Sequence, residues 1–255
     1  SRQADNTTHQ VKKLSDDNLQ DFIKKFSLPI NKKQLENLEY LTFNKNSKEF
    51  KYLENQRKKL GGYLPKRETT KKKLQFSNQK KFEDFDEISK REMSTTMVFV
   101  KLLTSLLRDQ KIGRHVVPIV PDEAGTFGMD GLFRQFGIYS REGQKYEPED
   151  ADKVMWYRES EDGVMLEEGI NEAGAFSAWL ALATSYANNS LPMIPFYIYY
   201  SMFGFQRIHD LAWAAGDARA RGFLLGATSG RTTLNGEGLQ HQDGHSHLLA
   251  QTIPN

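Results

Sequence analysis

A short stretch near the end of the chain concentrates side chains that can handle protons or bind metal. Residues 235–247 read NGEGLQHQDGHSH, with one Glu, one Asp and three His in thirteen positions. A metal-dependent hydrolase would use the ligands that this stretch offers: His241, His245 and His247, completed by Asp243 or Glu237. The HxxxHxH spacing differs from the HExxH pair of zinc proteases, and three glycines indicate an open loop. Spacing therefore leaves a metal site, a proton-handling or substrate-orienting site and a solvated loop all open.

Composition limits the class of protein. The chain has 255 residues and a mass of 29.3 kDa, enough to bury a sizeable core. It has no cysteine, which excludes disulfides, zinc–thiolate sites and cysteine nucleophiles. No apolar run approaches the roughly 20 residues that span a bilayer, so we expect a cytoplasmic protein with no membrane partner.

Charge is unevenly distributed. Residues 1–90 hold 21 Lys/Arg against 13 Asp/Glu, a balance of +8, and residues 91–255 hold 14 against 20, a balance of −6. The basic runs Lys71–Lys73 and Lys80–Lys81 lack interleaved aromatic residues, which nucleic-acid stacking surfaces need. This pattern favours a solvated basic surface and no nucleic-acid partner.

The change in charge near residue 90 also separates a weakly periodic region from a region with long apolar runs. Before residue 91, Ser15 and Asn31 can each cap a short helix, and residues 61–89 are polar and weakly periodic, typical of a linker with a short strand at residues 73–76. Ser94 can cap a longer apolar helix. We therefore expect a linker region over residues 1–90 and a compact domain over residues 91–255.

Within that domain, apolar runs alternate with helical stretches. The expected strands lie in residues 115–124, 164–170, 193–203 and 222–230, and the expected helices in residues 171–187 and 203–220. This alternation predicts an α/β fold with a mostly parallel sheet covered by helices on both faces. In such folds the chemistry gathers beyond the carboxyl ends of the strands.

Each polar or aromatic residue at those strand ends also has a structural explanation. Asp122, Glu123 and Glu172 can cap helices, because carboxylates favour helix N-termini. The aromatic cluster that includes Tyr200 and Phe203 can belong to the core. The isolated His115 and His209 receive no role.

Longer stretches of the sequence resemble a known family, which the spacing of single residues does not indicate. Four stretches within residues 121–247 closely resemble the thiamine-diphosphate-dependent decarboxylating component of bacterial pyruvate dehydrogenase complexes, of the long-chain homodimeric type: PDEAGTFGMDGLFRQFGIYS, EEGINEAGAFSAWL, LPMIPFYIYYSMFGFQRIHDLAWAAGD and TSGRTTLNGEGLQHQDGHSH. HQVKKL at residues 9–14 and QRKKLGGYLP at residues 56–65 resemble it too. Gly125 departs from the pattern, where a basic residue is expected.

The resemblance implies a transketolase-like pyrimidine-binding domain that is incomplete at its C-terminal end. The family's diphosphate-binding domain carries a GDG motif, which occurs nowhere in this sequence. Residues 1–90 would then be the tail of that domain plus a linker. Magnesium ligands are expected in the missing domain and none in this chain, and the active site is expected to form between two subunits of a homodimer.

The resemblance also implies roles for individual residues. Glu172 matches the carboxylate that hydrogen-bonds the pyrimidine nitrogen N1′ of thiamine diphosphate and so promotes the base form of the cofactor. Phe203 matches the aromatic residue stacked on the pyrimidine, and Tyr200 lines the same pocket. Asp122 and Glu123 match acidic residues near the cofactor and the dimer contact.

Three further matches concern the substrate side. Glu237 and His241 match residues facing pyruvate, where a histidine can exchange protons near neutral pH. His9 matches a histidine associated with acetyl transfer to the lipoyl domains of dihydrolipoyl acetyltransferase. The implied function is oxidative decarboxylation of pyruvate, with the isolated chain inactive. The alternatives are the metal-dependent hydrolase and a non-catalytic interaction module.

Overall fold

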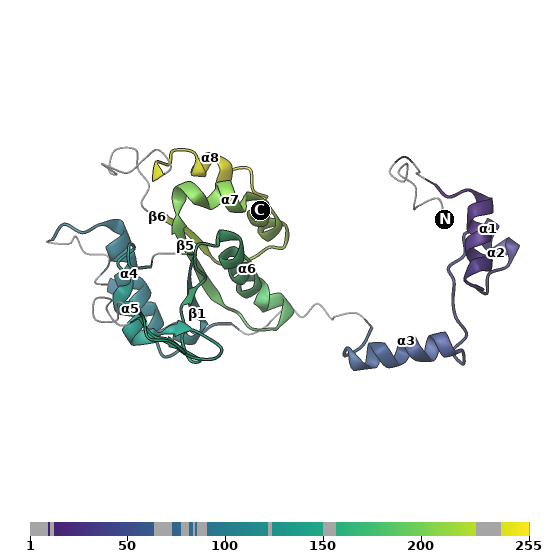
Figure 1. Ribbon diagram of the computed structural model, residues 1–255, viewed down its shortest axis with the longest axis horizontal. Coiled ribbons are helices and arrows are strands. Elements are labelled where there is room, and N and C mark those ends of the chain that lie inside the picture. Colours follow the sequence, from purple (N-terminus) through teal and green to yellow (C-terminus); the bar gives the residue numbers. More distant parts are fainter. Residues whose placement is uncertain are drawn as a thin grey trace. The chain divides into compact units, whose positions relative to one another are not determined.

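The computed structural model describes Gln10, Phe85 and residues 13–63, 73–77, 82–83, 91–121, 124–149, 157–227 and 241–254 (Figure 1). The chain divides into two compact units, residues 1–66 and residues 67–255. The first unit contains only helices among its described residues, and the second contains all the described strands. We describe each unit by itself.

The first unit contains helices α1 (Asp16–Lys25), α2 (Lys32–Glu36) and α3 (Lys48–Lys59). Ser15 caps α1 as the sequence predicts, and Asn31 caps α2 in a capping box with Gln34. Helix α3 begins after Ser47, whose side chain accepts a hydrogen bond from the Phe50 amide, and sequence analysis missed this helix. The short strand expected at residues 73–76, in the second unit, is wrong, because residues 73–77 form no strand.

The second unit is built around a sheet with strand order β4-β1-β5-β6, and all of its pairings are parallel. These strands span Leu166–Glu167 (β4), Val116–Val120 (β1), Ile194–Tyr200 (β5) and Phe223–Ala227 (β6). Its longer helices are α4 (Thr95–Leu107), α6 (Glu172–Asn188) and α7 (Ser201–Asp217). The shorter elements are the 3-10 helix η4 (Gly113–His115), α5 (Asp130–Phe136), the paired strands β2 (Ile138–Tyr139) and β3 (Glu159–Ser160), and α8 (Ser246–Ala250). The predicted parallel α/β fold is confirmed.

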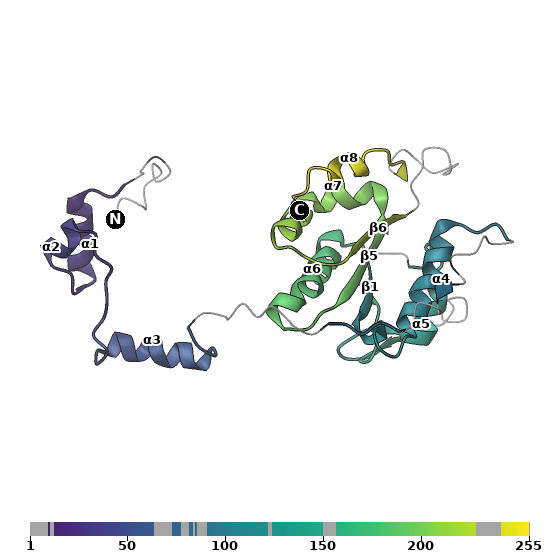
Figure 2. The same cartoon turned by 180° about the vertical axis from the view of Figure 1, so that it is seen from behind.

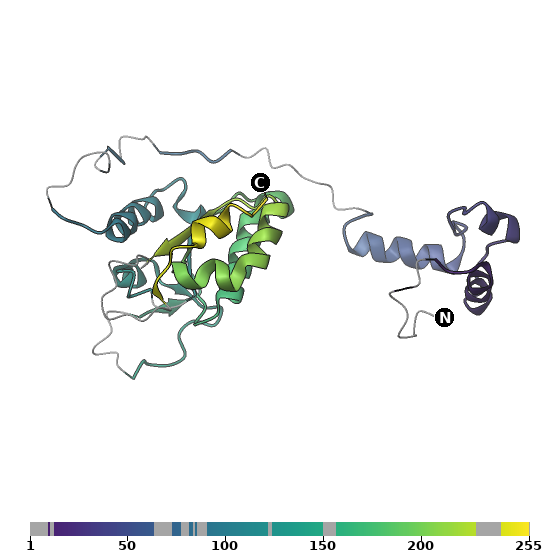
Figure 3. The same cartoon turned by 90° about the horizontal axis from the view of Figure 1, so that it is seen from above.

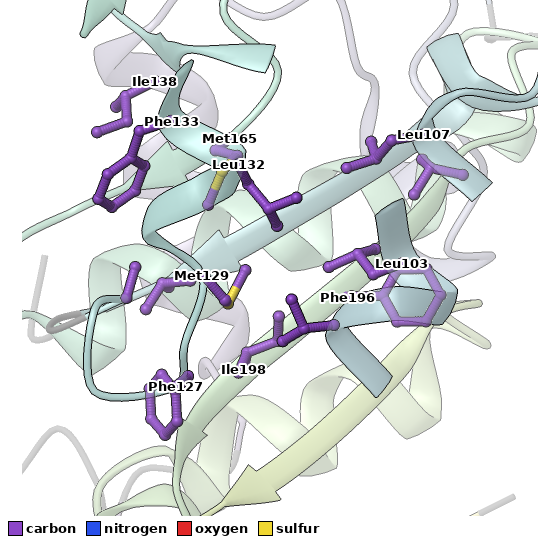
Figure 4. Close-up of a cluster of buried hydrophobic side chains, with 14 residues drawn as sticks. Leu103, Leu107, Phe127, Met129, Leu132, Phe133, Ile138, Met165, Phe196 and Ile198 are labelled. Carbon is purple, nitrogen blue, oxygen red and sulfur yellow. The ribbon is translucent and has the colours of Figure 1, made fainter. Parts of the chain in front are cut away.

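Helices cover both faces of the sheet, as Figures 1 and 2 show. Neighbouring residues of β5 point to opposite faces, as in any strand. Phe196 and Ile198 pack with α4 and α5, in the cluster of Figure 4 that includes Leu103, whereas Tyr197 and Tyr199 pack with α6 and α7. Both faces of β5 are therefore buried, which explains its nearly continuous apolar sequence.

The junction between β5 and α7 fixes the geometry of one end of the sheet. The strand ends at Tyr200 and the helix begins at Ser201, so the expected strand over residues 193–203 is too long at its C-terminal end. Phe203 consequently lies in the first turn of α7. No helix in the described part of the chain is long and apolar enough to cross a bilayer.

Glycine at position 204 allows this tight junction. A Cβ atom there would overlap the ring of Tyr199, which is only 4% exposed and cannot move aside easily. We expect Gly204→Ala to lower the free energy of unfolding by about 1–3 kcal/mol, the usual cost of overpacking a core. Gly131→Ala is the matched control, because a Cβ at this helical glycine meets nothing within 4 Å. Urea unfolding of the two variants measures the difference, and equal stability would contradict the proposed steric role of Gly204.

Candidate functional site

The site residues expected on α6, on α7 and in the stretch after residue 240 gather at the carboxyl end of β5. Glu172 is the first residue of α6. The cap of this helix is Asn171, whose side chain accepts a hydrogen bond of 3.0 Å from the Gly174 amide. The Glu172 carboxylate therefore does not serve as the N-cap acceptor and can take another partner.

That partner is Arg207, on the facing helix α7. The guanidinium Nη1 of Arg207 hydrogen-bonds Oε1 of Glu172 in an ion pair. The side chain of Glu172 is only 13% exposed, whereas that of Arg207 is 46% exposed. This contact spans 35 positions of the sequence, and sequence analysis gave no role to Arg207.

Arg207 also connects the carboxylate to the aromatic residue expected beside it. Its guanidinium carbon lies 4.4 Å from the ring centroid of Phe203, one helical turn earlier on α7, in a cation–π contact. Glu172 and Phe203 are thus held by the same guanidinium. A mostly buried carboxylate and an aromatic ring are therefore linked through one guanidinium.

An imidazole completes the cluster. The ring of His241 packs edge-on against two aromatic rings, with centroid distances of 5.7 Å to Tyr200 and 5.5 Å to Phe203. Tyr200 also packs against the ring of Phe127, at 5.1 Å between centroids. The structure therefore brings together four of the residues expected from the sequence: Glu172, Tyr200, Phe203 and His241.

The hydroxyl of Tyr197 is buried near the ion pair. It has no hydrogen-bond partner within the described part of the structure. Burial raises the pKa of Tyr197 above its usual range, Glu172 raises it further, and Arg207 opposes this effect. Tyr197 is therefore a neutral phenol at physiological pH and adds no charge to the site.

The other two histidines do not join His241 in a metal site. His245 directly precedes α8 and His247 lies within it, and both side chains are exposed. Across the described ranges, no three His, Asp or Glu residues lie close enough together to hold a metal ion. The geometry of these three histidines therefore does not supply the cluster that a metal-dependent hydrolase would need.

Four expected site residues lie outside the described residues: His9, Asp122, Glu123 and Glu237. Gly125, where a basic residue was expected, is described. A Cβ atom at Gly125 would lie 2.7 Å from Oδ1 of Asp130, so a longer side chain here would require that carboxylate to shift. A basic side chain at this position would have an acidic neighbour.

A parallel sheet with a carboxylate at the start of one helix and aromatic residues beside it is the arrangement of an α/β domain with a binding site at the carboxyl end of the sheet. The family described as the pyruvate dehydrogenase E1 component middle domain matches residues 76–255, and the chain belongs to this family. The chain is 57% identical to the pyruvate dehydrogenase E1 component of Cupriavidus necator, in an alignment that covers 99% of the chain and 28% of the relative.

Two other relatives are also pyruvate dehydrogenase E1 components. The chain is 56% identical to the pyruvate dehydrogenase E1 component of Pseudomonas aeruginosa, with 100% of the chain and 29% of the relative aligned. It is 55% identical to that of Escherichia coli K12, with 98% of the chain and 28% of the relative aligned. The chain thus spans a little over a quarter of the length of these relatives, and its family resemblance is confirmed.

Proposed function

We propose that this chain supplies the pyrimidine-binding half of the active site in a pyruvate dehydrogenase E1 component. The proposed reaction is the oxidative decarboxylation of pyruvate with transfer of the acetyl group to lipoyl groups. The observation that supports it best is the position of Glu172, a carboxylate that is 13% exposed and is paired with Arg207, whose guanidinium lies over the Phe203 ring.

These residues fit an aromatic heterocycle with a basic ring nitrogen. Phe203 offers a flat apolar surface for stacking, and Glu172 offers a carboxyl group for a hydrogen bond to the ring. When bound, thiamine diphosphate supplies the electron sink for decarboxylation of a 2-oxo acid. Glu172 is proposed to hold and exchange a proton at the ring nitrogen N1′, while Arg207 fixes the direction of the carboxylate.

His241 is proposed to act on the substrate side. Its imidazole lies against Tyr200 and Phe203, and an imidazole changes charge near neutral pH. It can therefore donate or accept a proton as pyruvate reacts and carbon dioxide leaves. Glu237 and His9 are proposed to assist substrate binding and acetyl transfer, and Asp122 and Glu123 to line the cofactor site.

The remaining parts of the function are proposed to need other polypeptide segments. Magnesium and the cofactor's diphosphate would bind another domain, since this sequence has no GDG motif. The partners would be a second E1 subunit and the lipoyl domains of dihydrolipoyl acetyltransferase. The cytoplasm, where pyruvate is produced, is the proposed location.

We expect the isolated chain to bind thiamine diphosphate weakly and to release no carbon dioxide from pyruvate. The charge-assisted contacts that hold the diphosphate are proposed to come from another domain. Titration calorimetry with thiamine diphosphate and magnesium measures the affinity. Micromolar binding would contradict the proposed division of the site between domains.

A chimeric enzyme tests the function itself. Residues 1–255 would replace the matching segment of the E. coli E1 component, to which 98% of the chain aligns at 55% identity. We expect carbon dioxide release from pyruvate that depends on both thiamine diphosphate and magnesium. A folded, dimeric chimera that binds the cofactor but does not decarboxylate pyruvate would contradict the proposal.

A further inference from the structure

The chain after residue 240 lies along helix α7. Ser246 Oγ donates a hydrogen bond of 3.1 Å to the carbonyl of Ser201, at the start of α7. Farther along, the Nε2 of His209 lies 3.0 Å from Oγ1 of Thr252. Figure 3 shows the segment, with α8, lying beside α7. The segment and the helix therefore run in the same direction, and His241 is near the first turn of α7.

Asp243 organises the beginning of this segment. Its Oδ1 accepts hydrogen bonds from two backbone amides, those of His245 at 2.9 Å and Ser246 at 3.1 Å. The hydroxyl of Ser246 also lowers the pKa of the carboxyl group and donates to the Ser201 carbonyl. Asp243 thus connects the segment to α7 through Ser246.

Ser201 approaches the same carboxylate. Its buried hydroxyl makes no close hydrogen bond within the described residues, but it helps to lower the pKa of Asp243. Burial raises this pKa, but the donors of Ser246 and His245, together with the nearby Ser201 hydroxyl, outweigh burial and lower it from 3.8 to about 2. The carboxylate is therefore ionised at neutral pH, and its Oδ1 accepts the hydrogen bonds from the amides of His245 and Ser246.

His241 lies two residues before this carboxylate. Its ring packs against Tyr200, the last residue of β5, and Phe203, in the first turn of α7. Ser201, which Asp243 and Ser246 contact, lies between those two residues in the chain. The imidazole and the anchored backbone therefore both contact the β5–α7 junction: the imidazole at Tyr200 and Phe203, and the backbone segment at Ser201.

We propose that Asp243 is the positioning residue for His241. Its carboxylate fixes the backbone of residues 243–246 on Ser201 and thereby holds the imidazole against Tyr200 and Phe203. The inference depends on the proposed function only for the role of His241 as an acid–base group. The anchoring itself can be measured without any catalytic assay.

The rest of the segment has an anchor of its own. Leu249, Ala250 and Ile253 pack against the core formed by α6 and α7. Loss of the Asp243 carboxylate should therefore loosen residues 241–246 and leave α8 docked. Asp243→Ala is expected to change the position of His241 more than the stability of the domain.

Hydrogen exchange in the chimeric enzyme tests the anchoring. Asp243→Ala should increase exchange at the amides of His245 and Ser246 at least about 10-fold, because both lose their acceptor. Asp243→Asn keeps an oxygen at the same place and should stay close to the parent. Asp210→Ala, at an exposed carboxylate on α7, is the matched control. Unchanged exchange in Asp243→Ala would overturn the proposal.

A double-mutant cycle tests the positioning role. Asp243→Ala should lower kcat by about 10- to 100-fold, the scale expected for a displaced catalytic group. In a His241→Ala background the same change should have little further effect, since Asp243 acts through His241. Asp243→Asn should restore most of the activity. Additive effects of the two substitutions would overturn the positioning role.

The outcomes separate this inference from the proposed function. If His241→Ala leaves activity unchanged, the proposed role of His241 fails, while exchange at His245 and Ser246 still reports whether Asp243 anchors the segment. If the His241→Ala enzyme turns over slowly and the Asp243→Ala enzyme is fully active, the proposed function stands. The role of Asp243 in positioning His241 is then wrong.

Discussion

Replacing Glu172 by Gln in the chimeric enzyme should lower the rate of carbon dioxide release from pyruvate by about 10²–10⁴-fold, the range typical for loss of an acid–base group. Glutamine has nearly the same size and can still hydrogen-bond, but it cannot exchange a proton with the ring nitrogen. The N-cap of α6 is Asn171, so the helix keeps its cap. The loss should therefore appear in turnover while the thermal unfolding temperature changes little.

Glu161→Gln is the matched control for this substitution. Glu161 is an exposed residue in the turn after β3 and belongs to no part of the site. It should retain parent activity. A Glu172→Gln enzyme that turns over pyruvate as fast as the Glu161→Gln enzyme would show that the carboxylate has no catalytic role.

Replacing His241 by Ala should also lower turnover by about 10²–10⁴-fold, but at a later stage of the reaction. The imidazole lies against Tyr200 and Phe203, whereas the Glu172 carboxylate is held by Arg207. Loss of the imidazole therefore leaves the Glu172–Arg207 pair intact. Pre-steady-state measurement of carbon dioxide release after mixing with pyruvate isolates the affected stage.

His247→Ala controls for general effects of losing an imidazole in this segment. His247 is exposed on α8 and contributes to no proposed contact with the cofactor or pyruvate. It should behave as the parent enzyme does. Equal losses in the His241 and His247 variants would indicate a general disturbance of the segment and would contradict a specific role for His241.

Local signals in the sequence predicted most elements of the α/β unit. Ser94 caps α4, as the sequence predicts, and the apolar run of residues 194–200 forms a buried strand. Helix α5 and the small β2-β3 sheet were missed, because each is short and depends on contacts with the rest of the domain. The expected end of β5 is too late, since only Ser201 interrupts the apolar residues that run from the strand into Met202 and Phe203 of α7.

Recognition of the site depended on long motifs. Spacing alone could not distinguish a helix cap from a cofactor ligand at Glu172, and the motif resemblance predicted the role that is now proposed. The sequence does not predict the role of Arg207, because its contact with Glu172 joins two helices across 35 positions of the sequence. The sequence suggests Asp243 only as a metal ligand, because its hydrogen bonds to backbone amides leave no signature in the sequence.

The boundary between the two parts of the chain stays a prediction. Charge and periodicity place it near residue 90, whereas the second compact unit spans residues 67–255 and the family match begins at residue 76. Composition marks where the apolar alternation begins. It does not mark where a polar segment first contacts the folded domain.

The rate at which the thiazolium C2 proton of bound thiamine diphosphate exchanges with deuterium tests the central claim most directly. It reports activation of the cofactor before pyruvate enters, the step assigned to Glu172. We predict exchange slowed by about 10²–10⁴-fold in the Glu172→Gln chimera, the range expected for a lost acid–base group, and near the parent rate in His241→Ala. Equally fast exchange in both variants would contradict the assignment of Glu172.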